Sequence, residues 1–126
     1  MSTVHANTPR DAFSRLETMV MMADLEIPTR VILQQLASAI KLVVQVSRLQ
    51  DGTRKIMSIS EVIGVRDEKV DLQEIFAFER IGMTDSGKVQ GRFRGTGVTP
   101  KILERLRVSG LQLNQQIFDE VVEVNM

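Results

Sequence analysis

The stretch LVVQVSRLQDG, residues 42–52, decides the fold, because it reads as a β-strand followed by a tight turn. Residues 42–49 are rich in valine, which favours strands, and the closing Asp-Gly pair is typical of antiparallel hairpins. Residues 55–63 are expected to return as the partner strand. Their alternation is interrupted where Ile56 and Met57 follow one another, so we expect this strand to be buried on both faces or to contain a bulge.

A second hairpin is predicted further along the chain. Residues 75–82 and 88–95 flank a turn at residues 85–87, which read Asp-Ser-Gly. Apolar residues and glycines alternate with polar residues from residue 89 to residue 95, which is the clearest period of two in the sequence. The middle of the chain is therefore expected to form two antiparallel hairpins.

The first helix has a recognisable start. Thr8 can cap it, Pro9 fits the first turn, and Asp11 lies where a capping-box carboxylate belongs. The helix should end before Pro28, because the residue that precedes a proline is disfavoured in helical geometry. Its apolar stripe consists of Ala12, Phe13, Leu16, Met19, Val20 and Ala23.

Two further helices are predicted. The second covers about residues 29–40, and the third starts after Thr99 and Pro100, which repeat the cap-and-proline pattern, and stops at Gly110. A last turn at residues 115–118 precedes a loose acidic end. The residues of the second helix expected to face inward are Val31, Ile32, Leu36, Ala39 and Ile40.

This order of elements predicts an α+β fold, or part of an α/β fold, with helices followed by antiparallel hairpins. Helices and strands do not alternate enough for a complete doubly wound sheet. The chain has 126 residues, which suits one compact domain, and 43% of them are hydrophobic. We therefore expect a single packed domain rather than a disordered chain.

Composition excludes several classes of function. Sixteen basic and sixteen acidic residues give a net charge of zero, which argues against a global field drawing the chain to nucleic acid or an anionic membrane. The absence of cysteine excludes disulfides, iron–sulfur clusters and thiol nucleophiles. No apolar run approaches the roughly 18 residues of a membrane span, and the N-terminus does not resemble a signal peptide. The expectation is a soluble intracellular protein.

Few residues suggest chemistry by themselves. His5 is the only histidine in the sequence, and no carboxylates lie at the spacing of a metal site. A hydrogen-bonded histidine at a strand end is therefore the simpler interpretation. Residues 91–97 are glycine-rich and precede a helix, but they lack the Lys-Ser or Lys-Thr of a P-loop and are better explained by close packing. Arg92 and Arg94 share one strand face, where they could bind an anion or a partner's carboxylates, or be solvated.

A longer pattern resembles a known family. Residues 3–19, TVHANTPRDAFSRLETM, closely resemble the histidine box of type II and type IV secretion ATPases, in the CpaF-like branch that drives Flp (Tad) pilus assembly. In that family a Thr-x-His-Ala-Asn stretch leads into a helix carrying Ala-x-x-Arg-Leu-Glu. The resemblance continues in order through residues 35–40, 44–49, 51–54, 59–62, 72–79 and 91–93, and Gly97.

The resemblance implies a RecA-like P-loop ATPase domain, working as a cytoplasmic hexameric ring at the inner membrane, with ATP and Mg²⁺. In such proteins the Walker A and Walker B segments precede the histidine box, and neither is present here. Residues 1–126 would then be a single C-terminal domain that begins at the histidine box, needs no cofactor and hydrolyses no ATP alone. The expected partners are inner-membrane pilus or secretion platform proteins, not nucleic acid. The chain is not expected to span the membrane.

The resemblance also suggests three site residues and no metal ligand. His5 would act near the terminal phosphate of ATP, although only in a full-length motor, and Thr3 matches the threonine that precedes this histidine. Arg15 matches the arginine of the following helix, where it would make a nucleotide-proximal or intersubunit contact, or a surface salt bridge with a nearby glutamate. The alternatives are a non-catalytic interaction module that docks on motor subunits or pilus components, and an enzyme with an unrecognised site.

Truncation before the histidine box should leave an unpaired strand edge and uncovered apolar helix faces, so self-association is expected. The predicted contact regions are residues 42–49 and the helix stripe through Phe13, Leu16 and Val20.

Overall fold

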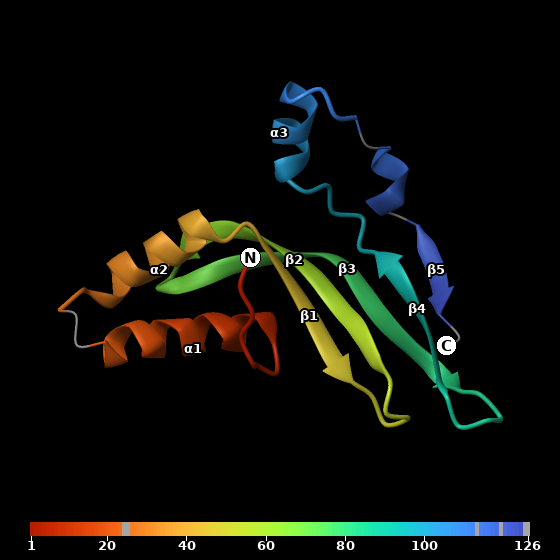
Figure 1. The fold of residues 1–126 in the computed structure, drawn as a ribbon. Helices are drawn as coiled ribbons and strands as arrows, with labels where there is room; N and C mark the ends of the chain where they lie inside the picture. The colour runs from red at the N-terminus through yellow and green to blue at the C-terminus, as the bar shows by residue number, and fades with distance from the viewer. Residues whose placement is uncertain (24–25, 113, 119, 125–126) are drawn as a thin grey trace.

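The computed structural model describes residues 1–23, 26–112, 114–118 and 120–124, which form a small α+β domain (Figure 1). Two N-terminal helices precede an open antiparallel sheet, and a short helix follows it. In chain order the elements are α1 (Pro9–Met22), α2 (Thr29–Ala39), β1 (Leu42–Arg48), β2 (Arg54–Arg66), β3 (Lys69–Met83), β4 (Val89–Gly95), α3 (Ile102–Val108), the 3₁₀ helix η1 (Gln115–Phe118) and β5 (Val121–Val124).

The strands form one meander in the order β1-β2-β3-β4-β5, with every neighbouring pair antiparallel. The two predicted hairpins are therefore joined by a third, whose turn contains Asp67 and Glu68 at φ angles of 52° and 62°. Positive φ at both turn residues suits the twist of a two-residue hairpin. This turn was not predicted from the sequence, because neither position is glycine or asparagine. As a result β2 and β3 are longer than predicted.

A bulge interrupts the pairing of β1 with β2. Gln45 is opposite Ser58 and Val46 is opposite Ile56, so Met57 has no direct partner. This confirms the bulge expected at the adjacent apolar pair. Further register shifts occur in the β2–β3 and β3–β4 pairs. Bulges increase local twist and bend a strand, which accounts for the curved sheet in Figure 1.

The first helix begins as its sequence predicts. The backbone N–H of Asp11 donates to Thr8 Oγ1 at 3.0 Å, and the Asn7 N–H donates to Asp11 Oδ2 at 3.3 Å. The first bond satisfies a donor that the first helical turn otherwise leaves without a partner, and the second ties the residue before the cap to the same turn. α1 ends at Met22, before Pro28, as expected.

Both N-terminal helices pack on one face of the sheet. Their shared core consists of Phe13, Leu33, Ala37, Val62 and Val70. The predicted inward face of α2 was partly wrong, since Val31 and Ala39 are exposed while Leu33 and Ala37 are buried. The segment is apolar on more than one side, so only its contacts with α1 and the sheet decide which side is buried. Phe13 is also buried rather than uncovered, contrary to the expectation for self-association.

The C-terminal elements build a second core. Ile75, Leu103 and Phe118 are buried together, and the rings of Phe76 and Phe118 lie 5.7 Å apart between centroids. The predicted stop at Gly110 is confirmed by its φ of +89°. The expected loose end is corrected, because Val121–Val124 forms β5 and pairs with β4.

The start of α3 also differs from the sequence prediction. Thr99 does not cap it: the helix begins at Ile102 without a capping side chain from its own N-cap residue, Lys101. Glu61 of β2 supplies that cap from a distant part of the chain. Among the helices in the described part of the chain, none combines the length and apolar character that a membrane crossing requires.

Candidate functional site

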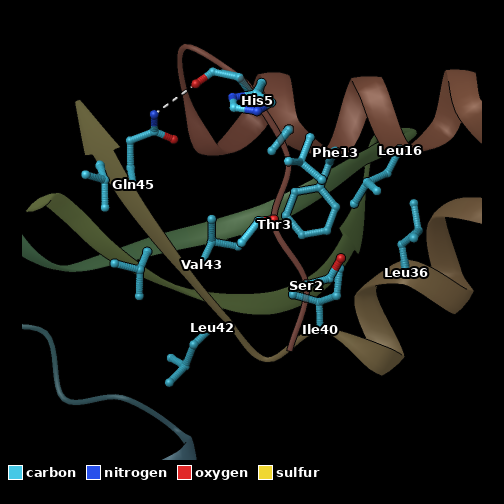
Figure 2. Close-up of a pocket in the computed structure, with 15 residues that line it drawn as sticks. Ser2, Thr3, His5, Phe13, Leu16, Leu36, Ile40, Leu42, Val43 and Gln45 are labelled. Carbon is cyan, nitrogen blue, oxygen red and sulfur yellow. Dashed lines mark hydrogen bonds between the residues drawn. The ribbon is translucent and has the colours of Figure 1, made fainter. Parts of the chain in front are cut away.

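The histidine-box segment lies between β1 and the start of α1 (Figure 2). His5 was expected at a strand end, but residues 2–5 form no strand and most of them are exposed. The segment is held by the side chain of Gln45, whose Nε2 donates to the Ala6 carbonyl oxygen at 3.0 Å. A single side chain of β1 thus fixes the box against the sheet, just before the capped start of α1.

A pocket of about 410 Å³ opens beside this segment. Its walls come from residues 2–6, α1, the end of α2 and β1, and Figure 2 shows Phe13, Leu16, Leu36 and Ile40 along it. The lining is mainly aliphatic and aromatic, with Gln45 among its few polar side chains. Apolar walls with a few polar groups are typical of small-molecule and peptide sites.

His5 and Thr3 both line this pocket, and both are exposed. No partner within the described ranges hydrogen-bonds the His5 imidazole, so the reading of His5 as a satisfied strand-end residue has no contact to support it. An exposed imidazole can accept or donate a proton to a ligand at this rim. No group of three or more His, Cys, Asp or Glu side chains in the described residues could hold a metal ion.

Arg15 is placed differently. It is exposed on α1 and is not part of the pocket wall. Its Nε lies 3.6 Å from Asp11 Oδ2, one helical turn away. Exposed pairs of this kind contribute little to stability. The structure therefore brings Thr3 and His5 together, but places Arg15 in a surface ion pair, whose partner is Asp11 rather than the predicted glutamate.

The two arginines of β4 have a partner within the chain. Arg92 Nε lies 2.9 Å from Glu79 Oε2, and Arg94 Nε lies 3.4 Å from the same oxygen. The Arg92 hydrogen bond, and then the nearby positive charges, hold the pKa of Glu79 below its ordinary value. Of the alternatives for these arginines, an anion, a partner's carboxylate or solvation, the structure shows a carboxylate, and it comes from β3 of the same chain.

The glycine-rich segment serves close packing at Gly91. A Cβ at this position would lie 2.7 Å from Phe78 Cε2 and 2.8 Å from the Glu79 carbonyl oxygen. Gly91 is buried, and the Phe78 ring occupies the space that a side chain would need. This confirms the packing interpretation at Gly91 over a phosphate-binding one.

Sequence reasoning missed Glu61, which is only 3% exposed. Its Oε1 accepts hydrogen bonds from Gln73 Nε2 at 2.7 Å and the Lys101 N–H at 2.8 Å. Its Oε2 accepts from the Ile102 N–H at 2.8 Å. All three donors lie in other elements, and the last two begin α3. Glu61 is therefore a structural carboxylate, and its position in the strand pattern did not distinguish it from a solvated one.

No protein-family model matches the chain, and a search of curated proteins finds no match. The site is therefore defined by its own geometry: an exposed imidazole, a hydroxyl and an apolar pocket at the start of a capped helix.

Proposed function

We propose that this chain is the C-terminal part of a cytoplasmic ATPase motor of the CpaF-like secretion type, which powers Flp (Tad) pilus assembly or type II or type IV secretion. In this proposal the domain completes a RecA-like fold together with a nucleotide-binding half that carries the Walker segments. The observation that carries it is the placement of the histidine box. His5 is exposed on a pocket rim just before the capped start of α1, where it can reach a ligand.

In such a motor His5 would act on the terminal phosphate of ATP. An imidazole there can stabilise developing charge or orient the attacking water, and both effects are felt mainly in the transition state. Thr3 lies on the same pocket wall and could position the nucleotide or a neighbouring subunit. Arg15 could exchange its ion pair with Asp11 for an intersubunit contact.

The chain alone should neither bind nor hydrolyse ATP. Phosphate binding in these motors needs a nest of backbone N–H groups and a lysine, and Mg²⁺ needs a Walker B carboxylate. The sequence contains no such loop, and its glycine-rich segment packs against Phe78 instead. Calorimetric titration with Mg-ATP should show no binding, and a micromolar dissociation constant would contradict the proposal.

The decisive experiment joins the chain to the Walker-containing half of a motor of this family in one polypeptide. His5→Ala should then lower turnover by about a hundredfold, with little change in the affinity for Mg-ATP. Arg92→Ala is the control, because this side chain pairs with Glu79 on the sheet and does not line the His5 pocket. Normal turnover in the His5→Ala motor would refute the role assigned to this histidine.

A second candidate, a non-catalytic module that docks on motor subunits or pilus-assembly components, is favoured by the exposed apolar face of β1. Leu42, Val44 and Val46 are 46%, 53% and 50% exposed on that edge strand. Open edges of this kind invite pairing with another chain. If Val44→Lys abolished assembly with the other half while His5→Ala changed nothing, this second candidate would replace the first.

A further inference from the structure

Two hairpin tips meet at one end of the sheet, where Figure 1 shows the β1–β2 and β3–β4 turns at the same side of the molecule. The Val89 N–H donates to Asp51 Oδ2 at 2.6 Å, and Arg80 Nη2 donates to Gln50 Oε1 at 3.1 Å. These bonds join the tips, which we define as residues 46–56 and 80–90, into one surface called the tip surface below.

The tip surface concentrates positive charge. It carries five basic and two acidic side chains, a net charge of +3. Since the whole chain has sixteen of each, the remaining residues carry eleven basic and fourteen acidic side chains, a net charge of −3. The basic side chains are Arg48, Arg54, Lys55, Arg80 and Lys88, and the acidic ones are Asp51 and Asp85. The net charge of the chain is zero because the positive tip surface is balanced by a negative remainder.

Exposed aliphatic side chains lie among these cations. Near the ends of their strands, Val46, Ile56, Ile81 and Met83 are 50%, 45%, 55% and 46% exposed. Exposed apolar side chains that gather on one surface and are surrounded by polar groups often mark a site that binds a protein or a membrane. The combination of cations and protruding aliphatic groups is characteristic of surfaces that rest in the interface of an anionic bilayer.

We propose that the tip surface binds anionic lipid membranes, with its arginines and lysines at the headgroups and its aliphatic side chains entering the interface. Charge complementarity would suit either an anionic bilayer or nucleic acid, and the exposed apolar side chains favour the bilayer. Nucleic acid would match the cations but offers no apolar phase to Ile81 and Met83. The inference does not rest on the motor proposal, because Val46 is the one tip-surface residue in the described lining of the His5 pocket and the variants that test the inference leave Val46 unchanged.

The test is binding of the whole chain to vesicles of equal parts phosphatidylglycerol and phosphatidylcholine, measured by flotation at about 0.1 M salt, where the Debye length is about 10 Å. Binding should be much weaker to pure phosphatidylcholine. Arg54→Gln with Lys88→Gln should weaken binding roughly 25-fold, since each basic side chain near an anionic leaflet contributes about fivefold. Both side chains are exposed, so the fold should survive.

The matched control is Arg10→Gln with Arg30→Gln, which removes the same charge from exposed positions in α1 and α2. This variant should bind as the parent does. Ile81→Ser with Met83→Ser keeps every charge and should still weaken binding about fivefold, because less apolar area enters the interface.

Several results would overturn the proposal. They are no binding to the anionic vesicles, equal binding to neutral vesicles, equal losses in the tip and control variants, and no loss in the Ser variant. Reversible self-association at low salt that the tip variant abolishes, without vesicle binding by the parent, would assign the tip surface to the acidic part of a second copy instead.

Discussion

Replacing Glu61 by glutamine tests whether this buried carboxylate holds the two halves of the fold together. Its oxygens accept three hydrogen bonds, from Gln73, Lys101 and Ile102. A glutamine of the same size can keep its oxygen near two of these donors. Its NH₂ group would then face the Ile102 N–H, so that two donors meet and one bond is lost.

The expected cost follows from these contacts. Hydrogen bonds to a charged acceptor contribute about 1.5–3 kcal/mol and neutral ones about 0.5–1.5 kcal/mol. Two bonds therefore weaken by about 1 kcal/mol each, and the third is lost at about 2 kcal/mol. The neutral glutamine avoids the cost of burying a charge, which offsets part of this loss in stability. We expect Glu61→Gln to lower the free energy of unfolding by about 2 kcal/mol.

Urea denaturation followed by circular dichroism gives the free energy of unfolding, and hydrogen exchange locates the change. Amides of α3 should lose protection first, because Glu61 caps the start of this helix. Glu74→Gln is the matched control, since Glu74 is an exposed carboxylate on the neighbouring strand β3. A loss below about 0.5 kcal/mol, or one equal to that of the control, would refute the capping role.

Three further outcomes follow from particular contacts. Gly91→Ala should destabilise the fold by about 1–3 kcal/mol in urea denaturation, because its methyl group would overlap the Phe78 ring; an unchanged midpoint would contradict this packing. Hydrogen bonds from Thr53 and then Val89 hold the pKa of Asp51 well below its ordinary value of 3.8. The stability that Asp51 contributes is therefore present above pH 3.8 and is lost as the pH falls through its folded pKa, so Asp51→Asn should flatten the decline of the melting temperature in acid. The parent should self-associate at high concentration through the edge of β1, and light scattering should show Val44→Lys closer to a monomer; a monomeric parent would contradict this.

Elements with strong local signals could be predicted from the sequence. Thr8 and Asp11 cap α1 as their spacing indicates, and Gly52, in the predicted Asp-Gly turn, has a φ of +83°. Such features depend on residues within four positions of one another, so one sequence contains the whole signal. The bulge at Met57 was also visible, because adjacent apolar residues cannot share one face of a regular strand.

The missed features depend on contacts between distant residues. Glu61 caps a helix that begins 41 positions later, and no local pattern marks such a partner. The buried side of α2 was ambiguous because more than one side is apolar, and its contacts with α1 and the sheet make the choice. The turn at Asp67 and Glu68 is imposed by the pairing of β2 with β3, since both residues adopt a φ that side chains disfavour.

The candidate site also combines features that the sequence suggested with features that depend on contacts between distant residues. His5 and Thr3 were selected by resemblance alone, because no carboxylates lie at the spacing of a metal site with His5. Their shared pocket is formed with α2 and β1, some forty residues away, so its existence could not be foreseen from the box itself. Arg15 lacked that tertiary support, and the ion pair that it makes with Asp11 is local.

The strand β2 contributes residues both to the cap of α3 and to the tip surface. Glu61, near the middle of this 13-residue strand, fixes the start of α3, while Arg54 at the beginning of the strand belongs to the tip surface. The cap and the tip surface therefore share one strand, yet they use residues of opposite charge at different points along it. A change at Glu61 should accordingly release α3 without altering vesicle binding, because the hydrogen bonds that join the tips do not involve the second core. Parallel loss of α3 protection and vesicle binding in Glu61→Gln would show instead that the sheet transmits the change along β2.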